Sequence, residues 1–289
     1  MATLSDAAYE DDAVARGQVV RRAHFDEVHF EARVVSDAQA LVVRDHRAIV
    51  VAFRGTEENP RDVVLDGAVV TVPGVFHGAH AGFASAVTSL ERPVTDVVRA
   101  QLAAHGPLEV WLTGHSLGGA MAQIYAVHLR SAGIPVAGVV TFGAPAPGKS
   151  EFSDYYGGLA ERTHRFENHE DIVPCLPPDQ VAWVQSGHVH AIYEDHVDTF
   201  SPSGSGCASV PSALVAQPLC DAPKGWRIAV GFALPGLTLS CELPEPSRAL
   251  LDLLLDVFSG RGGGLHGIAS YRSRLHTRLG RRALALVGG

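Results

Sequence analysis

The sequence lacks a long run of charge of either sign, which narrows the classes of partner that it can bind. Charged residues make up 19% of the 289 residues, and 31 acidic side chains outnumber 23 basic ones, for a formal net charge of −8. Only two of the basic residues are lysines, Lys149 and Lys224, and neither sign of charge forms a long run. Nucleic-acid binding needs basic side chains clustered on one surface. We therefore predict no nucleic-acid partner.

The chain also lacks segments that would cross or leave through a membrane. No stretch reaches the ~18 apolar residues that a transmembrane helix needs. Residues 1–12 are polar and acidic, without the apolar centre of a signal peptide. We therefore expect no stable transmembrane anchoring, and either a cytoplasmic protein or a secreted form that has been trimmed.

Cysteine is scarce, and its spacing does not indicate a metal site. Of the four cysteines, Cys207, Cys220 and Cys241 lie in one segment, Cys175 lies apart, and no CxxC pair occurs. A disulfide between Cys207 and Cys220 and a set of free buried thiols both fit this spacing, so the disulfide state stays open.

What the sequence does contain is an alternation of strand-like and helix-like apolar patterns. The predicted strands are residues 28–35, 40–43, 48–53, 108–113, 136–142 and 163–166. The predicted helices are residues 4–20, with Ser5 as N-cap, 82–104, 117–131 and 265–286. Strands and helices that alternate through short links form a mostly parallel central sheet with helices on both faces. We therefore predict a single α/β domain over residues 1–289, interrupted by an irregular segment at about 200–246.

The segment Gly114-His115-Ser116-Leu117-Gly118 has the GxSxG pattern, between a predicted strand and a predicted helix. In this pattern the serine sits on a sharp strand-to-helix turn, and small residues on either side leave room for it. A serine hydroxyl becomes an effective nucleophile when it is exposed beside a base and backed by hydrogen-bond donors. The backbone N–H of Leu117 lies at the start of the helix, where it can stabilise an oxyanion. We therefore predict Ser116 as a catalytic nucleophile.

Four other segments accompany this turn. They are Val51-Ala-Phe-Arg-Gly-Thr56, His80-Ala-Gly-Phe83, Thr141-Phe-Gly-Ala-Pro145 and Phe166-Glu-Asn-His-Glu-Asp-Ile-Val-Pro-Cys-Leu-Pro-Pro178. As a set, and in this order, they resemble the class 3 lipases, also called fungal-type triacylglycerol lipases. The resemblance covers about residues 7–200 and a short piece near the C-terminus. It implies the α/β-hydrolase fold and a serine esterase that needs no cofactor.

The predicted acid of a catalytic triad is Asp171. It follows a predicted strand, directly precedes an Ile-Val-Pro sequence and comes after Ser116, as the Ser…Asp…His order of this fold requires. The resemblance assigns the same residue. Glu170 and Asp154 are alternative carboxylates, which we interpret as solvated surface groups. The resemblance also implies that Thr56 is the second oxyanion donor, through its backbone N–H and its hydroxyl.

The base has to be chosen from 15 histidines. Those after Asp171 are His188, His190, His196, His266 and His276. The segment His266-Gly-Ile-Ala-Ser-Tyr271 resembles the family's C-terminal pattern of a histidine that opens a helix, with a tyrosine five residues later. We therefore predict His266 as the base, with His196 as the main alternative. The 95 residues from Asp171 to His266 exceed the family norm, and the insertion at 200–246 accounts for the excess.

Four side chains near the end of the family match raise the question of a metal site. His188 and His190 share one face of a strand, with Glu194 and His196 nearby. No cysteine and no HExxH spacing accompanies them. The resemblance explains His188 as a strand residue without a chemical role. We predict no metal.

Residues 57–73 are the candidate for a lid. Val63, Val64 and Leu65 form an apolar set within a polar frame, and Pro60 and Gly67 suit the start and end of a short helix. In the resembled lipases a short amphipathic helix at this place covers the serine in water and moves aside at an oil surface. A fixed surface helix whose valines belong to the core is the alternative.

Taken together, the sequence predicts a carboxylic ester hydrolase that acts on lipid esters, possibly at an oil–water or membrane surface. Two alternatives remain: a lipase-like binding or signalling module without turnover, and an esterase for non-lipid substrates. Acyl-chain preference and oligomeric state stay open.

Overall fold

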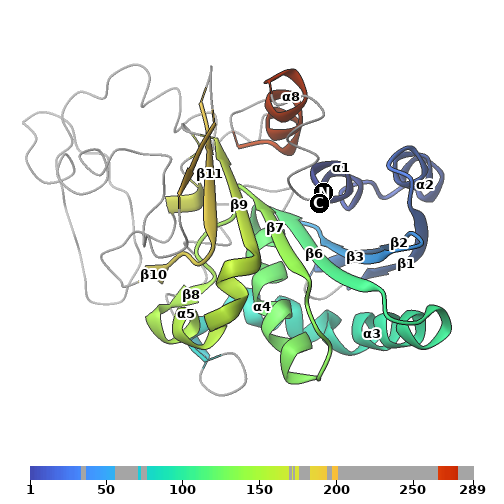
Figure 1. The fold of residues 1–289 in the computed structure, drawn as a ribbon, viewed down its shortest axis with the longest axis horizontal. Helices are drawn as coiled ribbons and strands as arrows, with labels where there is room; N and C mark the ends of the chain where they lie inside the picture. Colours follow the sequence, from blue (N-terminus) through green and yellow to red (C-terminus); the bar gives the residue numbers. More distant parts are fainter. Residues whose placement is uncertain are drawn as a thin grey trace, which may run out of the picture.

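The computed structural model describes residues 1–33, 37–55, 71–72, 77–168, 171, 173–175, 183–193, 197–200 and 266–278. Their centre is an eight-stranded sheet (Figure 1). Its strands, in spatial order, are β1 (Asp26–Ala32), β2 (Gln39–Arg44), β3 (Ala48–Phe53), β6 (Glu109–His115), β7 (Gly138–Phe142), β9 (Thr163–Asn168), β11 (His188–Ile192) and β12 (Val197–Phe200). The strands from β3 to β11 pair in parallel, and antiparallel pairs flank them at both ends. The predicted, mostly parallel sheet is confirmed.

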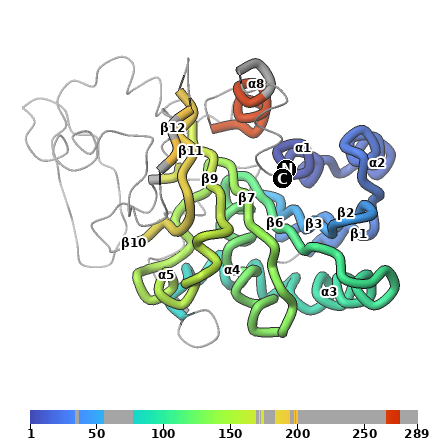
Figure 2. The backbone as a smooth tube through the Cα atoms, in the orientation of Figure 1, coloured from blue at the N-terminus to red at the C-terminus, as the bar shows by residue number. Residues whose placement is uncertain are grey.

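Helices cover both faces of this sheet (Figure 1). One face carries α3 (Ala81–His105), α4 (Leu117–Ser131) and α5 (Ser150–Tyr156). The other face carries α1 (Ala2–Ala7), α2 (Ala13–Arg22) and α8 (Ile268–Arg278). The tube in Figure 2 shows α1, in blue, beside α8, in red, although almost the whole chain separates them, and contacts between the two helices agree with this view.

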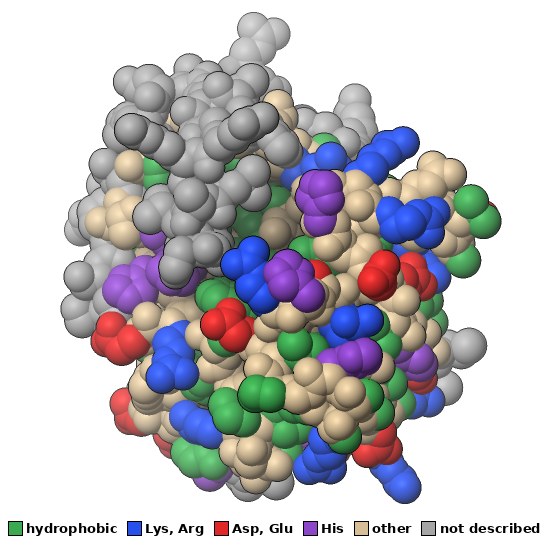
Figure 3. Space-filling view, turned by 45° about the vertical axis from the view of Figure 1, so that its right-hand side comes forward, with side chains coloured by type: hydrophobic (Ala, Val, Ile, Leu, Met, Phe, Trp, Pro, Cys, Tyr) green, Lys and Arg blue, Asp and Glu red, His purple; other side chains and the backbone are tan. Residues whose placement is uncertain are grey.

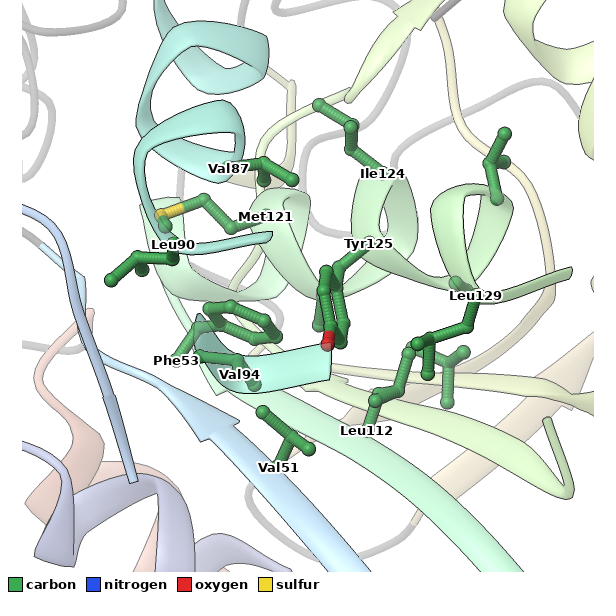
Figure 4. Close-up of a cluster of buried hydrophobic side chains, with 14 of the residues drawn as sticks. Val51, Phe53, Val87, Leu90, Val94, Leu112, Met121, Ile124, Tyr125 and Leu129 are labelled. Carbon is green, nitrogen blue, oxygen red and sulfur yellow. The ribbon is translucent and has the colours of Figure 1, made fainter. Parts of the chain in front are cut away.

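The main core lies between the sheet and helices α3 and α4 (Figure 4). Strand β3 is an uninterrupted apolar run, so its side chains can be buried on both faces. Val51 and Phe53 from this strand meet Leu90 of α3 and Tyr125 of α4, and all four are fully buried. Burying each such large side chain contributes roughly 1.5–3 kcal/mol. This core holds the C-terminal end of β3 against the start of α4.

Two short 3-10 helices and a small second sheet complete the described fold. A four-stranded sheet consists of β10 (Trp183–Val184), β8 (Gly148–Lys149), β5 (Ala79–His80) and β4 (Thr71–Val72). The 3-10 helices are η2 (Gly157–Arg162) and η3 (Val173–Cys175). In the part of the chain that the structure describes, no helix is long and apolar enough to cross a membrane.

The predicted single helix over residues 4–20, with Ser5 as its N-cap, is wrong. Two helices occupy this stretch, and Asp12 caps the second by accepting hydrogen bonds from the backbone N–H groups of Val14 and Ala15. Ser5 lies inside α1, buried, with its hydroxyl 2.9 Å from that of Thr113. An aspartate with two accepted bonds is a strong N-cap, whereas the Ser5 hydroxyl is engaged in a tertiary contact.

The face of the molecule in Figure 3 shows basic and acidic side chains interspersed on its described part, without a large patch of one sign of charge.

Several predictions lie outside the described residues. They concern Thr56, Glu170, His196, the insertion at about 200–246 after its first residue, with its three cysteines, and the lid at 57–73 apart from the two residues of β4.

Candidate active site

Ser116 lies on the turn that joins β6 to α4. Its backbone has φ 56° and ψ −132°, a left-handed conformation that is rare outside glycine and costs on the order of 1–3 kcal/mol. The turn is held because the backbone N–H of Ser116 donates to the carbonyl of Phe142 in β7 at 2.9 Å. The surrounding sheet therefore supports a strained residue between the end of a parallel strand and the start of a helix.

The two glycines of the motif are required by close backbone approach. A Cβ atom on Gly114 would lie 2.2 Å from the carbonyl group of Gly118. A Cβ atom on Gly118 would lie 2.2 Å from the carbonyl oxygen of Phe53, at the end of β3. Any side chain at either position would push the helix away from the strands. The motif thus brings the helix N-terminus against the end of β3.

The structure brings Ser116, His266 and Asp171 together in one hydrogen-bonded line. Nε2 of His266 lies 2.9 Å from Oγ of Ser116, and Nδ1 of His266 lies 2.9 Å from Oδ2 of Asp171. Asp171 is fully buried, Ser116 is 1% exposed and the His266 side chain is 11% exposed. A carboxylate only accepts hydrogen bonds, so Nδ1 of His266 carries the proton and Nε2 is free to accept from the serine hydroxyl.

Asp171 is held by three further hydrogen bonds. Its Oδ1 accepts from the backbone N–H of Val173 at 2.9 Å, and its own N–H donates to the carbonyl of Asn168 at 2.9 Å. Its Oδ2 also accepts from the hydroxyl of Tyr271 at 2.5 Å. These bonds fix the carboxylate that orients His266.

Gly143 faces this carboxylate and has φ +57°. A Cβ atom there would lie 2.6 Å from Oδ2 of Asp171 and 2.8 Å from the hydroxyl oxygen of Tyr271. The absence of a side chain at this position therefore makes room for the hydrogen bonds around Asp171. The pattern at Thr141–Pro145 identified this segment in the sequence. It did not reveal that Gly143 leaves room for the hydrogen bonds of Asp171.

Tyr271 was part of the C-terminal pattern, but its contact with Asp171 could not be read from the sequence. The tyrosine is fully buried, and its hydroxyl also accepts from the backbone N–H of Asn168 at 3.0 Å. Burial, followed by the charge of Asp171, raises the pKa of Tyr271 well above its ordinary value of 10. The hydroxyl therefore keeps its proton and remains a donor to the carboxylate.

The backbone N–H of Leu117 lies in the first turn of α4, directly after Ser116. The first N–H groups of a helix have no partner within the helix, and the helix dipole adds partial positive charge at this end. This group can therefore stabilise negative charge that develops beside Ser116. Thr56, the other predicted donor, follows the last described residue of its segment, Gly55.

His115, which we predicted only as part of the motif, makes two hydrogen bonds beside the site. Its Nδ1 lies 2.9 Å from the hydroxyl oxygen of Tyr9, and its Nε2 lies 2.5 Å from the carbonyl oxygen of His266. The contribution of Tyr9 was missed, because no sequence pattern links residue 9 to the turn at residue 116.

The remaining candidates lie away from this line. Asp154 is exposed on α5, as expected of a surface carboxylate. Nδ1 and Nε2 of His190 contact Thr199 and His164, each at 2.9 Å, and His188 stacks on His164. Among the residues that the structure describes, no group of three or more His, Cys, Asp or Glu side chains is placed to hold a metal ion.

Comparisons with known proteins point in one direction. Residues 50–181 match the family model described as Lipase (class 3). The secreted mono- and diacylglycerol lipase A of Penicillium cyclopium is 30% identical over 241 residues, which are 82% of this chain and 72% of the relative. A lipase of Rhizomucor miehei is 28% identical over 175 residues, covering 57% of this chain and 48% of the relative.

Solved structures agree in fold. The crystal structure of a lipase from Rhizopus microsporus var. chinensis superposes with a TM-score of 0.61 at 25% identity, over 72% of this chain and 78% of that one. A triacylglycerol lipase whose catalytic centre is described as a serine protease triad gives a TM-score of 0.63 at 26% identity, over 72% and 85% of the two chains. The predicted α/β-hydrolase fold is confirmed by these similarities.

Proposed function

Because the chain belongs to the class 3 lipase family, we propose that it hydrolyses carboxylic esters of lipids, with Ser116, His266 and Asp171 as its catalytic triad. One observation carries the proposal: Asp171, His266 and Ser116 form a continuous line of hydrogen bonds, each 2.9 Å long. In that arrangement the imidazole is oriented to take a proton from the serine hydroxyl.

The proposed reaction proceeds through an acyl-enzyme. Oγ of Ser116 attacks the ester carbonyl carbon while Nε2 of His266 takes the hydroxyl proton. Asp171 holds the imidazole in the required tautomer and stabilises the imidazolium. The tetrahedral intermediate collapses as His266 passes the proton to the departing alkoxide, which leaves as an alcohol. Water, deprotonated by His266, then attacks the acyl carbon. The bond from this carbon to Oγ of Ser116 breaks, His266 returns the proton to Oγ, and the carboxylic acid leaves.

The proposed oxyanion site consists of backbone N–H groups. Leu117 contributes the group at the start of α4, and Thr56 is the second proposed donor, on the strength of its match to the family motif. Donors that are already oriented before the reaction stabilise the developing charge without reorganisation. No cofactor takes part in this scheme.

Acylglycerols are the proposed substrates. The relatives include lipases named for mono- and diacylglycerols and for triacylglycerol. The apolar set Val63, Val64 and Leu65 in the proposed lid segment supports a substrate presented at an oil–water or membrane surface. Small water-soluble esters and a binding module without turnover are the alternatives. The connected line of side chains supports turnover over a silent module, because its hydrogen bonds match the roles proposed for the three groups.

The test combines active-site labelling with a substrate series. We expect wild type to react with a fluorophosphonate probe at Ser116 and to hydrolyse both a chain-length series of p-nitrophenyl esters and emulsified triglyceride. Ser116→Ala should lose both activities, whereas Ser153→Ala, which changes a serine on α5, should keep them. Folded wild type that neither labels nor turns over any ester would instead establish the silent module. Turnover restricted to short, dissolved esters would establish a non-lipid esterase.

A further inference from the structure

Two polar side chains beside the proposed triad take no part in the proposed reaction. They are Tyr9, which follows α1, and His115, the residue before the nucleophile. We propose that Tyr9 and His115 are positioning residues, which together hold the backbone of His266 and the end of β3 in the geometry that ester hydrolysis needs. This inference rests on the proposed function.

The direction of each hydrogen bond follows from the chemistry of the groups. The carbonyl oxygen of His266 only accepts, so Nε2 of His115 carries a proton and donates to it at 2.5 Å. Nδ1 of a neutral His115 is then bare and accepts from the hydroxyl of Tyr9 at 2.9 Å. The oxygen of Tyr9 in turn accepts from the backbone N–H of Gly55 at 3.1 Å. One continuous chain therefore runs from Gly55 through Tyr9 and His115 to His266.

His115 is held in the neutral form by its surroundings. It is 5% exposed, and its ring centre lies 4.7 Å from that of His266. Burial, followed by the charge of protonated His266, lowers the pKa of His115 well below 6.5, which outweighs the opposite effect of the bond to the carbonyl. A neutral ring can orient the proposed base without repelling the imidazolium that forms during the reaction.

The space around Gly55 agrees with a positioning role. A Cβ atom there would lie 2.3 Å from the hydroxyl oxygen of Tyr9 and 2.7 Å from the carbonyl oxygen of His115. The backbone at the end of β3 is therefore pressed against both positioning residues. Gly55 directly precedes Thr56, so the peptide that Tyr9 holds leads into the proposed second oxyanion donor.

The segment that carries Tyr9 contacts three parts of the structure around the proposed site, which are β6, α8 and the end of β3. Ser5 contacts Thr113 of β6, and Asp6 forms an ion pair with Arg272 of α8. Asp11 forms an ion pair with Arg54, the residue before Gly55, at 2.8 Å. Tyr9 therefore belongs to a segment that packs against the elements beside the proposed triad and the proposed oxyanion donors.

The experiment measures kcat and KM for a soluble p-nitrophenyl ester. Tyr9→Phe removes one oxygen atom and breaks the chain at its centre, so we expect kcat to fall about tenfold or more with little change in KM, since small misplacement of reacting groups has large effects on rate. The fluorophosphonate labelling rate should fall in parallel. The matched control is Tyr156→Phe, which removes a buried hydroxyl bonded at 2.6 Å to Thr163, the first residue of β9. It should leave kcat unchanged.

Two substitutions of His115 test the other half of the chain. His115→Gln retains a donor that can reach the carbonyl of His266, so it should keep more activity than His115→Leu. Because both residues act as one unit, Tyr9→Phe combined with His115→Leu should be no slower than His115→Leu alone. Should His115→Leu fail to fold, Tyr9→Phe and His115→Gln decide the matter.

The outcomes separate this inference from the proposed function. Wild type without ester turnover or labelling contradicts the proposed function and this inference with it. Active wild type, with kcat of Tyr9→Phe within about twofold of wild type, overturns the positioning role alone. A change in KM without a change in kcat overturns it as well, since the two residues would then affect binding. Equal effects of Tyr9→Phe and Tyr156→Phe on kcat would show that the contact between Tyr9 and His115 contributes only to the stability of the fold, and would overturn the positioning role.

Discussion

The hydroxyl group of Tyr271 donates to Oδ2 of Asp171, the same oxygen that accepts from Nδ1 of His266. Tyr271 and His266 lie five residues apart, at the start of α8 and in the turn before it. A single short segment therefore supplies both the proposed base and a second donor to the proposed acid. Through this arrangement, the placement of α8 determines the orientation of both side chains.

We expect Tyr271→Phe to lower both activity and stability. The lost hydrogen bond leaves a buried carboxylate with one donor fewer, which costs on the order of 1–3 kcal/mol. Loss of orientation at Asp171 should also lower kcat about tenfold. Urea unfolding and ester kinetics measure the two effects. The control Tyr125→Phe removes a buried hydroxyl bonded to Thr95 and should lower stability alone. Unchanged kcat in Tyr271→Phe would contradict the prediction.

His266→Ala should be as damaging as Ser116→Ala. Loss of a triad member typically costs ~10⁴- to 10⁶-fold in rate, and members of one catalytic unit are not additive. The double variant should therefore be no slower than either single variant. His188→Ala, which changes a half-buried histidine on β11, is the control and should keep most activity. An active His266→Ala would remove this residue from the proposed triad and leave His196 as the next candidate.

Gly118→Ala should impair folding and activity together. The added Cβ atom would meet the carbonyl oxygen of Phe53 at 2.2 Å, so α4 has to move away from β3. We expect a loss of more than about 2 kcal/mol in the free energy of unfolding, as is typical of severe steric conflict. Gly158→Ala is the matched control, because nothing lies within 4 Å of its added atom. Equal stability of the two variants would contradict the described approach of helix and strand.

The contact between His164 and His190 should make stability depend on pH. Burial first, and then the charges of His164, His188 and Arg165, lower the pKa of His190 from 6.5 to about 4. Burial, followed by the charge of His188, also lowers the pKa of His164. Between the two pKa values the unfolded chain binds more protons than the folded one, so stability falls as the pH drops from 6.5 towards 4. The contribution of these two histidines to the free energy of unfolding is fully present above about pH 6.5.

Urea unfolding across this range tests the effect. His190→Phe keeps an aromatic ring to stack on Phe166, whose ring centre lies 4.6 Å away, but it cannot titrate. We therefore expect a flatter dependence of unfolding free energy on pH in His190→Phe. His46→Asn, in the exposed turn between β2 and β3, should keep the wild-type slope. A slope in His190→Phe as steep as that of wild type would assign the effect to other groups.

Local patterns predicted much of the fold because they are strong where side chains are buried. The run at 48–53 is apolar at every position, and β3 has those bounds. The small residues after Ser116 predicted a helix at 117–131, which is α4. The N-terminal helix was misjudged because apolar residues lie on both sides of the acidic stretch 10–12. The cap at Asp12 starts a second helix there.

At the candidate site, the sequence marked Ser116, Asp171 and His266, and the structure brings these three together. Each belongs to a motif whose spacing carries information about local geometry. Tyr9 was not marked, because its bond to His115 spans 106 residues and has no local pattern. Side-chain contacts of this range depend on how whole elements dock, which periodicity and motif spacing do not describe.

The contact between α1 and α8 joins the first and the last described helices, which the ribosome makes at widely separated times. Asp6 and Arg272, which join the two helices, are 266 residues apart. At ~5–20 residues per second, a ribosome needs on the order of 15–50 s to travel between them. Ser116 is made 150 residues before His266, so for part of that interval the nascent chain carries its proposed nucleophile without its proposed base. On these proposed roles, ester hydrolysis by a growing chain requires that residues 266–278 have been made and that α8 packs against α1.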